Sequence, residues 1–237
     1  MPRRYPQETL ALMWGRDPTS ISRYIADWAC EWGDAGENLS ILDIDADYLN
    51  ASLPEAYKAQ GLTKVGLVPD GKDFMIHTPR SNTLITRACW SDKVHHSAFR
   101  VISWSTPAGL SVEHTHMFLG RPPEPTLVEL WGKRLRKCPA GFSMLSDRGF
   151  ANTAHLYPNF NAQLTPSFLK GRLQFTSDEV GSDYEICKLR YTCEVAFSRV
   201  VQEAALQDVI PYHFFSIIDA MNHWGHANVN LGAPLMT

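Results

Sequence analysis

The sequence predicts an α/β body, with a mixed sheet flanked by helices, preceded by a small helical appendage. Apolar residues with helical spacing occur near the N-terminus, and apolar strand-like segments with hairpin signals begin at about residue 64. Helical patterns then alternate with further strands, which is typical of such a body. The connecting segments are short, so we expect one unit over 64–230, with a connector at 34–63 and a tail at 231–237.

Residues 1–33 are expected to form two helices around a tight turn. Gln7 to Trp14 is the first helix, and Asp17 can cap the second, with Pro18 at its first position. Glycines at 33 and 36 are expected to end this second helix.

The second helix has one apolar face and one polar face. The apolar residues at helical spacing are Ile21, Ile25, Trp28, Ala29 and Trp32. The opposite face carries Ser20 and Arg23, which suits a helix-turn-helix whose second helix enters a DNA groove. A plain helical hairpin packed on the body is the alternative, and the spacing alone favours it.

The expected elements of the body follow in order. Strands are predicted at 65–70, 73–77, 97–106, 110–118 and 142–145, with a hairpin at Pro107-Ala108-Gly109. Helices are predicted at 125–137 and 183–207, and a last helix from Pro211 to about residue 228.

Two carboxylates stand at the ends of predicted strands, and a third lies in a predicted helix. Asp70 and Asp147 each follow an apolar strand, and Glu194 lies in an apolar helical segment with Arg190 four residues earlier, where the two can pair. Glycines at 71 and 149 permit a sharp turn and close approach of a ligand. Carboxylate oxygens suit Mg²⁺, and a pair of such ions can activate water and stabilise a leaving phosphodiester oxygen. Ordinary helix caps and ion pairs are the alternative interpretation of these residues.

Several ordered segments share one further pattern. They are Val68–Ile76, Trp90–His96, Ser105–Leu110, Leu145–Phe150, Pro166–Gly171, Arg190–Arg199, Ile210-Pro211 and Asn222. In order and approximate spacing, they resemble the DDE superfamily endonucleases of the Harbinger transposase type, over residues 64–230.

This resemblance implies an RNase H-like fold and DNA strand cleavage and joining that depends on Mg²⁺ or Mn²⁺. It implies that Asp70, Asp147 and Glu194 are the metal-binding catalytic residues, with Arg190 in a supporting role. It also implies DNA as the partner and a nuclear location, and it strengthens the interpretation of residues 1–33 as a partial helix-turn-helix.

The sequence departs from the family's pattern at several positions. Val195 and Val201 stand where relatives often carry basic residues, and Glu124 stands where they often carry Asp after the hairpin. The alternative function is therefore a domesticated, catalytically inactive subunit that binds DNA or protein. Its partner would be a separate DNA-binding protein or another copy of the chain.

A basic cluster is the second candidate DNA contact. It consists of Lys133, Arg134, Arg136 and Lys137 on the predicted helix, with Arg148 nearby. Such a cluster can contact phosphates, and a solvated helix face is an equally good interpretation. His114 and His116 share a face of a predicted strand, where a structural role is favoured over a metal pair.

The composition excludes several classes of protein. The formal net charge of −3 argues mildly against wholesale nucleic-acid binding, although local patches can still bind a phosphate backbone. Five scattered cysteines without a CxxC argue against a disulfide framework and a structural zinc site. No apolar run approaches the length of a membrane span, and we expect an intracellular protein without a membrane partner.

Overall fold

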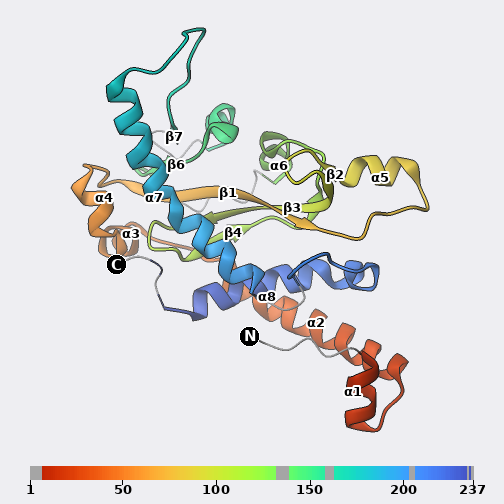
Figure 1. Ribbon diagram of the computed structural model, residues 1–237. Helices are drawn as coiled ribbons and strands as arrows, with labels where there is room; N and C mark the ends of the chain where they lie inside the picture. The colour runs from red at the N-terminus through yellow and green to blue at the C-terminus, as the bar shows by residue number, and fades with distance from the viewer. Residues whose placement is uncertain (1–6, 132–138, 158–162, 203–205, 234, 236–237) are drawn as a thin grey trace.

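The computed structural model describes residues 7–131, 139–157, 163–202, 206–233 and 235 (Figure 1). A mixed sheet lies at the centre, with strands in the order β2–β3–β1–β6–β7 and with β4 and β5 also paired to β3. The strands are β1 (Val65–Met75), β2 (Trp90–Ser91), β3 (His96–Ser105), β4 (Ser111–His114), β5 (Phe118–Leu119), β6 (Ser143–Leu145) and β7 (Gln163–Leu164). Strand β1 runs antiparallel to β3 and parallel to β6. The predicted α/β class with a mixed sheet is confirmed.

Helices flank this sheet. They are α1 (Gln7–Trp14), α2 (Pro18–Ser40), α3 (Ala46–Ser52), α4 (Glu55–Ala59), α5 (Thr83–Cys89), α6 (Glu124–Trp131), α7 (Ser177–Val201) and α8 (Ile218–Leu231), with 3-10 helices η2 (Arg148–Leu156) and η3 (Tyr212–Ile217). The long helix α7 crosses the sheet, and α8 and α2 lie beside each other beyond it (Figure 1). None of the helices in the described part of the chain has the length and apolar character that a membrane span requires.

Several predicted boundaries are wrong. The expected strands at 65–70 and 73–77 are one strand, because residues 68–75 pair without interruption with residues 98–105 and Gly71 stays extended within the ladder. The expected strand at 110–118 is divided into β4 and β5, because the Thr115 hydroxyl accepts a hydrogen bond from the Ile102 amide between them. Helix α7 begins earlier than expected, because Thr176 and Glu179 form a capping box.

Gly33 and Gly36 were expected to end helix α2, and this prediction is wrong. The helix continues to Ser40. Its two glycines permit close packing against α8. A Cβ on Gly33 would lie 2.5 Å from the Ala220 Cβ, and a Cβ on Gly36 would lie 2.9 Å from the Trp224 backbone nitrogen. The two glycines therefore allow α2 and α8 to pack closely, and this packing outweighs the low helix propensity of glycine.

Gly36→Ala is expected to destabilise the protein by about 1–3 kcal/mol, because the added methyl group meets the backbone of α8 and forces the two helices apart. Urea denaturation measures this free energy. Gly181→Ala is the matched control, because nothing lies within 4 Å of its Cβ position in α7. That variant should gain about 0.5–1 kcal/mol. Equal effects of the two substitutions would contradict the packing role of Gly36.

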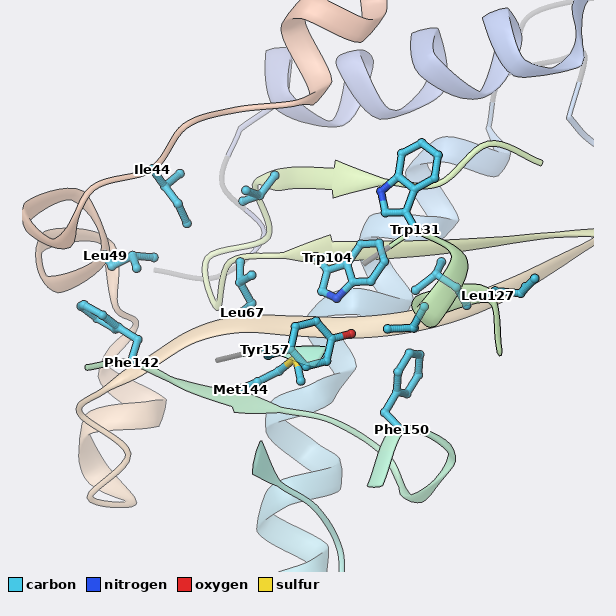
Figure 2. Close-up of a cluster of buried hydrophobic side chains, with 13 residues drawn as sticks. Ile44, Leu49, Leu67, Trp104, Leu127, Trp131, Phe142, Met144, Phe150 and Tyr157 are labelled. Carbon is cyan, nitrogen blue, oxygen red and sulfur yellow. The ribbon is translucent and has the colours of Figure 1, made fainter. Parts of the chain in front are cut away.

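The segment 34–63, expected as a connector, contributes to the core. Ile44 and Leu49 belong to the same buried cluster as Leu67, Trp104 and Met144 (Figure 2). The Tyr57 hydroxyl lies in a different cluster and donates a hydrogen bond to the Leu189 carbonyl of α7. This segment therefore joins the appendage to the sheet through buried contacts.

Three histidines lie buried where β4, α8 and α2 meet. The rings of His114 and His226 stack with centroids 4.2 Å apart and planes 10° apart, and the His223 ring lies 4.8 Å from that of His114. His114 Nε2 lies 2.8 Å from Ser40 Oγ, and His226 Nδ1 lies 3.1 Å from Ser111 Oγ. Burial lowers the pKa of all three and brings that of His226 to about 3. The three imidazoles are therefore neutral in the folded protein at neutral pH.

Candidate functional site

The carboxylates of Asp70 and Asp147 converge at one rim of the sheet. Asp70 lies within β1, and Asp147 follows β6, the parallel neighbour of β1. Arg190 Nη2, from α7, lies 3.7 Å from Asp70 Oδ1 and 3.7 Å from Asp147 Oδ2. Two of the three predicted carboxylates therefore meet at one guanidinium group.

Glu124 joins this pair. A Cβ on Gly71 would overlap the Glu124 carboxylate, and a Cβ on Gly149 would lie 2.7 Å from Glu124 Oε2 and 3.0 Å from Asp147 Oδ1. The two glycines were expected to allow a turn and a ligand, and they provide space for this third carboxylate. Glu124 was not among the predicted site residues and was noted only as a departure from the pattern of the resembled family, where Asp is frequent.

The core holds each of these side chains in place. Glu124 begins α6, whose Leu127 and Trp131 pack in the cluster of Figure 2. Asp147 caps η2 by accepting a hydrogen bond of 2.7 Å from the Gly149 amide, and the buried Phe150 anchors the same turn. The site is therefore fixed by the packing beneath it.

Burial and neighbouring cations shift the pKa values of the carboxyl groups in opposite directions. Burial raises the pKa of Asp70, and the nearby Arg190 and Lys93 oppose that rise. Burial likewise raises the pKa of Glu124, against the attraction of Lys93, whose Nζ lies 3.8 Å from Glu124 Oε1 and donates to the Gly71 carbonyl. Arg100, which pairs with Asp73, also opposes the rise at Glu124, so these acidic side chains are compensated by neighbouring cations.

The Arg190 side chain is only 13% exposed, yet few close polar contacts hold it in place. Its two ion pairs are longer than hydrogen bonds, and its buried Nε has no hydrogen-bond partner among the described residues. The expected pairing of Arg190 with Glu194 is wrong, because the side chain turns toward Asp70 and Asp147. Tertiary attraction by two partly buried carboxylates outweighs a local helical pair.

Glu194 lies one helical turn after Arg190 and is exposed. The carboxylates of Asp70 and Glu194 both add to the rise that burial causes in the pKa of the Cys193 thiol. Glu194 is adjacent to Cys193 in the chain, and its participation in the site stays a prediction.

The donors have the chemistry for a hard divalent cation, since carboxylate oxygens are the preferred ligands of Mg²⁺. In the residues that the structure describes, however, no three His, Cys, Asp or Glu side chains are arranged to hold a metal ion. A single Arg190 nitrogen approaches both aspartates. A cation would bind them only if this guanidinium group moved away.

The other predicted contacts are dispersed. Arg148 lies beside Asp147, with Nη2 3.3 Å from Asp183 Oδ2 and its guanidinium carbon 5.2 Å from the centre of the Phe175 ring. The Ser20 hydroxyl donates to Asp17 at the start of α2, and Arg23 is exposed on that helix. The basic cluster Lys133, Arg134, Arg136 and Lys137 lies outside the described residues.

The pair His114 and His116 is divided. His114 is fully buried at the end of β4, whereas His116 is exposed and lies 3.5 Å from Asp219 Oδ2. The structural role predicted for His114 agrees with its burial.

Comparisons of the chain with protein-family models, with curated proteins and with solved structures find no match.

Proposed function

We propose that this chain is a DNA-cleaving and strand-joining domain that uses Mg²⁺ or Mn²⁺ at the rim formed by Asp70, Asp147 and Glu124. The observation that supports this best is the convergence of three carboxylates from segments far apart in the sequence. Asp70 and Asp147 also belong to segments that resemble DDE endonucleases, whereas the third carboxylate that this resemblance implies is Glu194. When bound, the cation would activate a water molecule and stabilise the leaving oxygen.

The residues of the chain have distinct roles in this proposal. Asp70 and Asp147 supply oxygen ligands from neighbouring strands, and Glu124 or Glu194 completes the set. Arg148 is 47% exposed beside Asp147 and is free to exchange Asp183 for a backbone phosphate. The same ion pairs of Arg190 also favour a second function, a transposase-derived subunit that has lost catalysis and keeps its acidic residues as structure.

Asp147→Asn separates these functions. The amide removes the charge that holds a divalent ion, so cation binding should weaken and nicking of duplex DNA should be lost. Asparagine is also a good helix cap, so the hydrogen bond to Gly149 and the fold should be retained. Calorimetry with Mg²⁺ and a plasmid-nicking assay with Mg²⁺ or Mn²⁺ measure the two effects, with Asp47→Asn on α3 as control.

The outcomes are distinct. Binding and nicking by the natural chain and the Asp47 variant, but not by the Asp147 variant, support the enzyme. Binding without nicking supports the subunit that kept its site. A folded protein that neither binds nor cleaves would eliminate the enzyme proposal.

A further inference from the structure

The helical hairpin α1–α2 has a large exposed aromatic surface, hereafter the hairpin face. It consists of Trp14, Tyr24, Ile25, Trp28 and Trp32. Trp14 and Trp28 are each 63% exposed, and Tyr24 and Trp32 are 47% and 46% exposed. The sequence pattern placed Trp28 and Trp32 on a packed face; Trp28 is largely exposed, whereas the Trp32 ring packs edge-on against Trp224 of α8 with centroids 4.9 Å apart. The hairpin extends away from the sheet, so the start of α2 has only α1 beside it (Figure 1).

Two hollows meet on the hairpin face. One of about 530 Å³ is lined by Trp14, Arg16, Tyr24, Ile25 and Trp28. The other, of about 280 Å³, is lined by Trp28, Ala29, Trp32, Ala220, Met221 and Trp224. Trp28 stands between them and lines both. Exposed apolar surface of this kind marks binding sites, and Trp and Tyr are the side chains enriched at the centres of protein interfaces.

A row of charges runs along α2 beside the aromatic row. Tyr24, Trp28 and Trp32 repeat every four residues, and Arg23, Asp27 and Glu31 repeat at the same interval, one position earlier. All three charged residues are exposed. Two acids in three positions disfavour a phosphate backbone as the partner. A row that begins basic and ends acidic is complementary to itself when a second copy runs antiparallel.

We propose that the hairpin face binds the hairpin face of a second copy of this chain, with the two α2 helices antiparallel about a twofold axis near Trp28. This register places the Trp28 rings together and Tyr24 opposite Trp32 of the second copy. A twofold interface is self-complementary, so each pair occurs twice.

The charges agree with this register, with one exception. Arg23 lies opposite residue 33 of the second copy, and Glu31 of that copy is only two residues away, about 3 Å along the helix. Two Arg23–Glu31 pairs therefore form at the edge. The two Asp27 carboxylates approach each other near the axis, and their repulsion weakens the dimer.

Sedimentation velocity over a wide range of protein concentration tests the contact. The full chain should show a concentration-dependent dimer, and Trp28→Ala should weaken it by about thirtyfold or more, since Trp28 lies at the centre. Tyr184→Ala on α7 is the matched control, because Tyr184 is 66% exposed and lies outside the hairpin face. Circular dichroism verifies that each variant keeps its helices.

Charge reversal tests the register. Arg23→Glu and Glu31→Arg should each weaken the dimer by about tenfold, and the double variant should recover it. Asp27→Asn should strengthen the dimer. A chain that stays monomeric, a dimer indifferent to Trp28→Ala, or a double variant no better than the single ones would overturn the proposal. So would a monomer whose binding to duplex DNA depends on Trp28.

Discussion

Acidification should destabilise this protein steeply below about pH 6.5, the ordinary pKa of histidine. His114, His223 and His226 are neutral in the fold and become protonated when it opens. Their folded pKa values are lowered, so the stability is fully present above the unfolded value and is lost as pH falls. At about pH 5 the loss should reach about 2 kcal/mol for each of the two fully buried rings, His114 and His226.

Neighbouring groups modify this effect differently at the three histidines. The carboxylates of Glu37, Asp34 and Asp219 favour the protonated form of His223, and His116 opposes it. At His114 and His226 burial is the main cause, and the neighbouring histidines add to it. The pH dependence should therefore arise chiefly from the stacked pair.

Urea denaturation between pH 5 and 8 measures this dependence. His226→Leu removes one titrating ring, so the slope of stability against pH should fall by about one proton, or about 1.4 kcal/mol per pH unit. His95→Gln is the control, because His95 is exposed and belongs to no buried cluster. Stability that stays constant from pH 7 to pH 5 would refute this account of the histidines.

Arg190→Gln should make the acidic rim bind Mg²⁺ at least about tenfold more tightly. A unit charge near two partly buried carboxylates competes with any cation that approaches them, and its removal eliminates that competition. Without a cation, the two aspartates should repel each other and the apo variant should be less stable than the natural chain. Mg²⁺ should restore that stability, because binding to the native state stabilises it.

Calorimetry and thermal denaturation with and without Mg²⁺ measure both effects. Lys188→Gln removes the same charge from an exposed position of α7 and should change neither. If Arg190→Gln binds Mg²⁺ no better than the natural chain, Arg190 does not compete for the site. The aspartates would then be a structural ion-pair cluster, as in the second candidate function.

Local chemistry made part of this structure predictable. Asp17 and Pro18 identified the start of α2, and Asp17 does accept a hydrogen bond from the Ser20 amide. The apolar segments before Asp70 and Asp147 identified two strands, and their parallel pairing brings the two carboxylates together. The capping box at Thr176 also has a sequence signature, with Glu179 three residues after Thr176.

Tertiary contacts decided the rest. Gly33 and Gly71 have the local character of breakers, but a crossing helix and a neighbouring strand keep both in regular structure. Glu124 lies far from Asp70 and Asp147 in the chain, so only the packing of α6 brings it to them. Arg190 lies at helical spacing from Glu194, but its side chain turns instead toward Asp70 and Asp147, which are distant in the sequence.

The pairing of α2 with α8 affects how the chain is made. Helix α2 is synthesised before the sheet and α7, and α8, the helix that covers Gly33 and Gly36, follows only after them. Contacts over such a sequence separation form late and slow the folding reaction. During synthesis the α8-facing side of α2 is without its partner, which makes the nascent chain a candidate for chaperone binding and for aggregation.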